Sequence, residues 1–106
     1  LLVTNINVDG QDIEASVVRP GDYLRMVVSL ENTLGYDLEE VKVDASIQEL
    51  GIRDMDLVHT LESGDTANVV FHLEIPEYAE PGFYDLRIVS SNDDVRRVKY
   101  RVIAIV

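Results

Sequence analysis

The clearest feature of the chain is an alternation of apolar and polar residues with a period of two. Successive side chains of a β-strand point to opposite faces, so this alternation is typical of a strand with one buried face. Four segments show it without interruption, namely Tyr23 to Glu31, Glu40 to Gln48, Thr66 to Ile75 and Phe83 to Val89. The residues expected to point inward are Leu24, Met26, Val28 and Leu30, then Val41, Val43, Ala45 and Ile47, then Ala67, Val69, Phe71, Leu73 and Ile75, and finally Tyr84, Leu86 and Ile88.

The last segment, Val95 to Ile105, alternates as well. One of its faces is apolar and the other is basic: Val98, Tyr100, Val102 and Ala104 share the first, and Arg97, Lys99 and Arg101 share the second. Ile103 and Ile105 then make both faces apolar. We expect the end of the chain to be buried on two sides, because a strand covered on both faces is apolar on both.

The pattern is weaker in two other regions. Leu2 to Val8 and Ile13 to Arg19 predict two short strands, or one strand interrupted at Asp9-Gly10. Gln48 to Asp65 fits neither the strand nor the helix period, and we expect one short strand there, from Met55 to Thr60. No window of 11 or more residues keeps the apolar spacing of an amphipathic helix, so no substantial helix is predicted.

Turn residues divide these segments into lengths typical of an all-β domain. Pro20-Gly21 and Pro81-Gly82 are turn signals, and about seven strands follow one another at intervals of about 8 to 12 residues. We therefore predict that residues 1–106 form a single immunoglobulin-like, two-sheet antiparallel sandwich with Greek-key connections, with a small barrel as the alternative. Tyr84 follows Pro81-Gly82 closely, where it can bury its ring and return its hydroxyl to nearby backbone, as in a tyrosine corner.

The charge of the chain limits its partners. Twenty acidic and nine basic residues give a net charge of −11, which repels phosphate backbones and anionic lipid headgroups. We therefore expect no nucleic-acid partner. No apolar run approaches the roughly 18 residues of a membrane span, so we expect no membrane insertion either. The absence of cysteine excludes disulfides, thiolate metal sites and a cysteine nucleophile.

The sequence carries no recognisable catalytic arrangement, and we expect neither an enzyme nor a cofactor. Calcium is the alternative, because acid-rich turns supply the oxygen ligands that it prefers, and Asp9, Asp12 and Asp22 are the candidates. These acids can equally cap turns and solvate the surface.

Aromatic and basic side chains are the remaining candidates for contact with a partner. Tyr36 and Tyr78 fall in expected loops, where each can contact a ligand or cover an end of the sandwich. Arg96, Arg97, Lys99 and Arg101 crowd the last strand. They can pair with acids of a neighbouring strand, guard an exposed strand edge, or bind an anion.

Several of these turn and core residues also form a familiar pattern. Val17 to Asp22, Val27 to Gly35 and Leu38 to Val43 resemble the "PGD…v.v.v.N.G…l.dV.v" opening of immunoglobulin-like repeats in archaeal surface-layer-related proteins and bacterial cell-adhesion-related (CARDB) modules. Leu61 to Asp65 and Ile75 to Ile88 resemble their "l.pGd" and "iP…a.pG.Y.l.i".

The resemblance implies a non-catalytic structural or adhesion module, part of a larger multi-domain protein that is secreted or held in the cell envelope. Its implied partners are neighbouring domains of the same chain or another surface protein. The alternative is a calcium- or glycan-binding sandwich that uses its end loops. The matched residues are turn and core positions, so the resemblance says nothing about chemistry.

Overall fold

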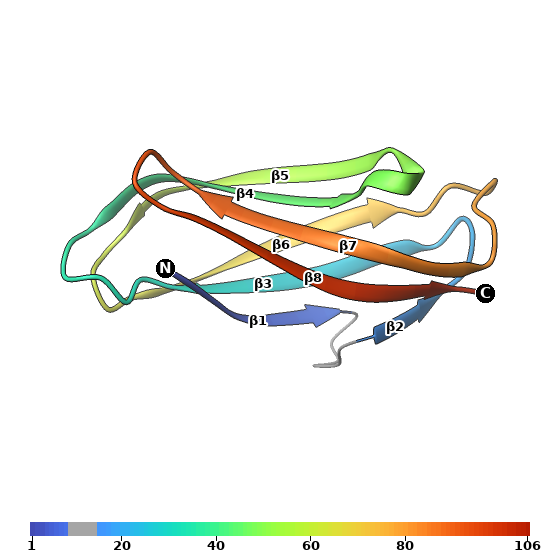
Figure 1. Cartoon of the computed structure of the whole chain (residues 1–106), viewed down its shortest axis with the longest axis horizontal. Helices are drawn as coiled ribbons and strands as arrows, with labels where there is room; N and C mark the ends of the chain where they lie inside the picture. The colour runs from blue at the N-terminus through green and yellow to red at the C-terminus, as the bar shows by residue number, and fades with distance from the viewer. Residues whose placement is uncertain (9–14) are drawn as a thin grey trace.

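The residues that the structure describes form eight β-strands, and the alternation of apolar and polar residues is clearest in Tyr23–Glu31, Leu38–Ile47, Thr66–Glu74 and Gly82–Ser91. The computed structural model describes residues 1–8 and 15–106 (Figure 1). The strands are β1 (Leu2–Val8), β2 (Ala15–Val18), β3 (Tyr23–Glu31), β4 (Leu38–Ile47), β5 (Ile52–Leu61), β6 (Thr66–Glu74), β7 (Gly82–Ser91) and β8 (Arg96–Ile105). A short 3-10 turn, η1 (Gln48–Leu50), joins β4 to β5. Among the described residues, no helix is long and apolar enough to cross a membrane.

The strands form two sheets packed face to face, as predicted. The smaller sheet has the order β1-β3-β6, and the larger has the order β2-β8-β7-β4-β5. Every pair is antiparallel except β2 with β8, where Ala15 lies opposite Val102 and Val18 opposite Ile105 in parallel. The predicted two-sheet, mainly antiparallel sandwich is confirmed, and the parallel pairing of β2 with β8 departs from it. The physical reason is that β2 continues in the direction of β1 but lies in the other sheet, where β8 runs the same way (Figure 1). The immunoglobulin-type Greek key stays a prediction.

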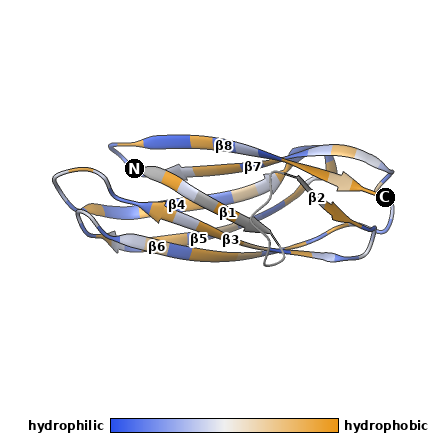
Figure 2. Cartoon of the chain, turned by 90° about the horizontal axis from the view of Figure 1, so that it is seen from below, coloured by the Kyte–Doolittle hydropathy of each residue, from blue (hydrophilic) through white to orange (hydrophobic). Residues whose placement is uncertain are grey.

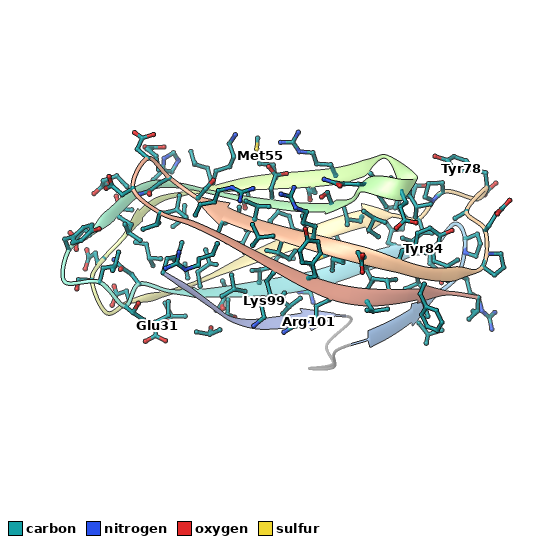
Figure 3. All side chains as sticks on the ribbon, viewed as in Figure 1. Glu31, Met55, Tyr78, Tyr84, Lys99 and Arg101 are labelled. Atoms are coloured by element: carbon teal, nitrogen blue, oxygen red, sulfur yellow. The ribbon has the colours of Figure 1, made fainter. Side chains whose placement is uncertain are left out.

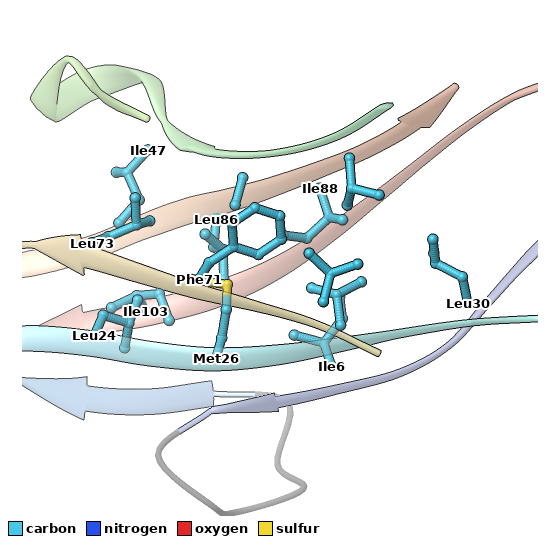
Figure 4. Close-up of a cluster of buried hydrophobic side chains, with 14 of the residues drawn as sticks. Ile6, Leu24, Met26, Leu30, Ile47, Phe71, Leu73, Leu86, Ile88 and Ile103 are labelled. Atoms are coloured by element: carbon cyan, nitrogen blue, oxygen red, sulfur yellow. The ribbon is translucent and has the colours of Figure 1, made fainter. Parts of the chain in front are cut away.

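Alternate residues of both sheets fill the space between them. The buried side chains include the labelled residues of Figure 4, namely Ile6, Leu24, Met26, Leu30, Ile47, Phe71, Leu73, Leu86, Ile88 and Ile103. The inward residues predicted for β3, β4, β6 and β7 are confirmed, with Ala67 and Tyr84 partly buried at the border of the core. The Tyr84 hydroxyl donates a hydrogen bond to the Glu80 carbonyl at 2.7 Å, as expected for a tyrosine corner.

Strand β5 is longer than the short strand predicted from Met55 to Thr60. It is a ten-residue edge strand that pairs with β4. Asp54 lies opposite buried Ala45 and accepts a hydrogen bond from the backbone N–H of His72 at 3.4 Å. A charge on the inner face of an edge strand disrupts the expected alternation, and it also protects the edge from pairing with another chain.

Strand β8 turns its apolar face outward, which contradicts the expected burial on two sides. Ile103 and Ile105 are buried, so the residues in phase with them, including Lys99, point inward. The Lys99 ammonium donates to the Val3 carbonyl at 3.3 Å, across the open side of the sandwich. A long charged side chain can bury its stem there and keep its head polar, whereas the apolar set of β8 is left to face solvent.

Candidate functional site

The outer face of the larger sheet contains a hollow of about 520 Å³. Its lining is mostly polar and includes three arginines: Asp44, Ser46, Gln48, Gly51, Ile52, Arg53, Arg87, Val89 and Arg96. The inner residues of β4 and β7 are buried, so the intervening residues of these strands point away from the core and into this face.

Strand register places twelve residues in three rows across β5, β4, β7 and β8. The rows are Arg53–Ser46–Arg87–Tyr100, then Met55–Asp44–Val89–Val98, then Leu57–Lys42–Ser91–Arg96. We call these twelve residues the central face. Side chains directly opposite each other on one face of a sheet lie close enough to interact, so the rows form a continuous surface.

One ion pair lies on the central face. Arg53 donates from Nε to Oδ1 of Asp44 at 2.7 Å and from Nη2 to Oδ2 at 2.9 Å. The hydrogen bond to Asp44, followed by the attraction of its charge, raises the pKa of the Arg53 guanidinium above its ordinary value. This two-bond geometry matches a planar guanidinium to a planar carboxylate. Both oxygens of Asp44 are therefore already bonded.

Two other arginines of the hollow have no such partner. Arg87 on β7 is half-buried and Arg96 on β8 is exposed. Within residues 1–8 and 15–106, neither forms an ion pair. The hollow therefore holds positive charge that its own described side chains do not neutralise.

Exposed apolar side chains extend from the central face toward β2. Phe83 is 78% exposed, Val17 67% and Tyr100 54%, and Val98 and Val102 are also exposed. Val17 and Phe83 both lie opposite Ala104, so the strip crosses β2, β8 and β7. Figure 2 shows apolar and polar residues alternating along β8. The apolar residues on this outer side make the strip continuous with the arginine-lined hollow.

The two tyrosines proposed from the sequence do not share a surface. Tyr36 is 51% exposed and Tyr78 is 75% exposed. The connection from β3 to β4, which contains Tyr36, lies at the opposite end of the sandwich from Tyr78 (Figures 1 and 3). The Cα atoms extend over 44 × 23 × 16 Å. One small ligand therefore cannot contact both tyrosines.

The calcium candidates are only partly placed by the structure. Asp9 and Asp12 lie outside the described residues. The Asp22 carboxylate accepts a hydrogen bond from the backbone N–H of Arg19 at 3.1 Å, closing a turn in which Gly21 has a φ of +85°. Asp22 thus caps a turn. In the part of the chain that the structure describes, no three His, Cys, Asp or Glu residues come together as a metal site.

The basic residues of the last strand separate into different roles. Arg97 and Arg101 donate to the carbonyls of Arg96 and Tyr100 at 2.9 Å, so they shield backbone acceptors of β8. Only Arg96 of this group lines the hollow. The edge-guarding interpretation therefore fits Arg97 and Arg101, and the described residues contain no ion pair between β8 and a neighbouring strand.

Sequence reasoning missed Arg53 and Arg87 as members of one surface. Arg87 could have been noticed, because it lies between Leu86 and Ile88 on a strand whose alternation predicts that it points outward. Arg53 could not, because the strand that carries it was not predicted at that position, and its register with Ser46 exists only in the folded sheet.

Comparison with known proteins supports the fold. No family model matches the chain, and no curated protein sequence matches it. A family 123 glycoside hydrolase from Clostridium perfringens aligns with a TM-score of 0.56 and 15% identity over 86% of this chain and 22% of its own. Spo0M, a sporulation control protein from Bacillus subtilis, aligns with a TM-score of 0.55 and 11% identity over 99% of this chain and 50% of its own.

These similarities establish the fold class of the protein, and they do not establish a family or a function. The chain is an all-β sandwich domain. It spans about a fifth of the hydrolase chain and half of the sporulation protein. At such low identity the shared feature is the fold, and one fold serves many functions.

Proposed function

We propose that this protein is a non-catalytic interaction module of a secreted or cell-surface multi-domain protein. It contacts a neighbouring domain of the same chain or another surface protein. The observation that carries the proposal is the exposed apolar strip of Val17, Phe83, Val98, Tyr100 and Val102 on the outer face of the larger sheet.

Such a strip favours contact with a protein surface. Scattered exposed apolar residues are ordinary, but contiguous ones on one face mark interaction sites. Tyrosine and arginine are also the residues that contribute most often to interface energy, and Tyr100 lies directly opposite Arg87. The outer face of the larger sheet therefore combines apolar area with polar groups that can orient a partner.

The chemistry of the hollow favours binding over catalysis. Asp44 is its carboxylate, and both of its oxygens accept hydrogen bonds from Arg53. Glycoside hydrolysis typically uses a pair of carboxylates, one of them free to act as a nucleophile or base. The glycoside hydrolase similarity therefore contributes the fold to this proposal and not an activity.

The location outside the cell rests on the resemblance to envelope repeats in Val17 to Ile88. Such repeats resemble sandwich modules of larger envelope proteins, and an exposed sheet face is suited to contact with another domain. The calcium- or glycan-binding alternative would place the contact at the end loops, where Tyr36 and Tyr78 lie at opposite ends.

Hydroxyl-radical footprinting tests the proposal, because it reports the solvent exposure of individual side chains. The complete native protein on intact cells is compared with the isolated chain of 106 residues. We expect Phe83 and Tyr100 to be oxidised in the isolated chain and protected in the native assembly. Tyr23, 64% exposed on the outer face of the smaller sheet, is the internal control and should react equally in both.

Two results would contradict the proposal. Equal oxidation of Phe83 and Tyr100 in both samples would show that the outer face of the larger sheet has no partner. Protection of Tyr36 or Tyr78 alone would place the contact at an end of the sandwich and support the ligand-binding alternative.

A further inference from the structure

We infer that the central face recognises an acidic protein partner, whose carboxylates enter the arginine-lined hollow. This inference rests on the proposed function and adds the chemistry of the partner. The inference is based on two arginines, Arg87 and Arg96, which form no ion pair with a carboxylate among the described residues. Both arginines lie beside the apolar residues of the central face.

The central face is a basic region in a strongly acidic protein. Its twelve residues include four basic side chains, Lys42, Arg53, Arg87 and Arg96, and one acidic side chain, Asp44. These twelve residues have a net charge of 4 − 1 = +3, whereas the whole chain has a net charge of −11. Glu49 and Asp85 border them, because both line an adjoining hollow together with Arg87 and Tyr100. Most of the molecule repels an acidic partner, whereas the central face attracts it. This difference determines where the partner docks and in which orientation.

The chemistry of the hollow points to a carboxylate. Asp44 and Arg53 already form a two-bond carboxylate–guanidinium pair in it. Arg87 presents the same planar donor group, is half-buried, and has no ion-pair partner within the described residues. A partly desolvated guanidinium gains more from an opposite charge than a fully hydrated one, because water screens the interaction less.

The apolar residues of the central face identify the rest of the partner. Met55, Leu57 and Tyr100 surround the charged positions and are exposed. A partner that offers acidic residues next to apolar ones satisfies both parts of the surface. A face-to-face second copy would oppose one net charge of +3 to another. A polyphosphate has no apolar groups to pack on Met55, Leu57 and Tyr100.

The test is a titration of the folded chain with a hexaglutamate peptide at constant ionic strength, followed by NMR of the arginine Nε–Hε groups. We expect saturable shifts at Arg87 and Arg96 and no response to a hexaglutamine peptide. Arg87→Gln should weaken binding at least tenfold. Arg19→Gln, which removes the same charge from an exposed turn, should change binding less than twofold.

Four outcomes overturn the inference. They are the absence of saturable shifts, equal weakening by Arg87→Gln and Arg19→Gln, tighter binding of inorganic phosphate than of hexaglutamate, and a concentration-dependent dimer through the central face in analytical ultracentrifugation. The backbone spectrum of each variant reports whether it is folded.

The two experiments together distinguish a failure of this inference from a failure of the proposed function. If hexaglutamate does not bind but Phe83 and Tyr100 are protected in the native assembly, the interaction module stands and its acidic partner is rejected. If Phe83 and Tyr100 are also unprotected, the interaction face itself is rejected.

Discussion

Strands β6 and β8 have similar alternating patterns and opposite outcomes. Phe71 on β6 belongs to an apolar set that faces the core and is 0% exposed. Tyr100 on β8 belongs to an apolar set that faces solvent and is 54% exposed. Alternation shows that a strand has two different faces, but the opposite sheet decides which face is covered. An aromatic residue on an alternating strand can therefore serve either stability or binding.

The largest expected effect on stability is that of replacing Phe71, which lies in the core. Phe71→Ala should lower the free energy of unfolding by about 3 to 5 kcal/mol, because it removes a large buried side chain and leaves a cavity. Urea denaturation followed by circular dichroism measures the loss. A loss below about 1 kcal/mol would mean that the two sheets do not pack tightly around this ring.

An intermediate effect on stability is expected at Tyr84, whose side chain is less buried than that of Phe71 and less exposed than that of Tyr100. Tyr84→Phe should cost about 1 kcal/mol, because it removes the hydrogen bond to the Glu80 carbonyl and keeps the ring. The matched control is Tyr23→Phe on the exposed outer face of β3, where a change within about 0.5 kcal/mol is expected. Equal effects in the two variants would contradict a structural role of the Tyr84 hydroxyl.

The smallest effect on stability is expected at Tyr100. Tyr100→Thr should change the free energy of unfolding by no more than about 0.5 kcal/mol, since threonine retains β-propensity and the ring is largely exposed. The same variant should weaken binding in any assay with the native partner. A stability loss similar to that of Phe71→Ala would remove the distinction between the two strands.

The candidate site could be predicted only in fragments. The sequence indicated four basic residues on the last strand as one group, and the structure places only Arg96 of that group in the hollow. It also singled out Tyr36 and Tyr78, which the fold separates to opposite ends. A surface made from four strands depends on their lateral order and register, and neither property is encoded in the spacing of residues within one strand.

The sequence by itself determined the all-β class, the inward residues of β3, β4, β6 and β7, and the turn that precedes Tyr84. These follow from local periodicity and turn chemistry, which act within a few residues. The tertiary structure decided the features that depend on neighbouring strands: the parallel pairing of β2 with β8, the full length of β5, and the outward apolar face of β8. At the open sides of the sandwich, charged side chains such as Asp54 and Lys99 can point inward and reach backbone groups of the other sheet. Which face of a strand is covered is therefore a property of the packed sheets, because burial depends on what lies opposite.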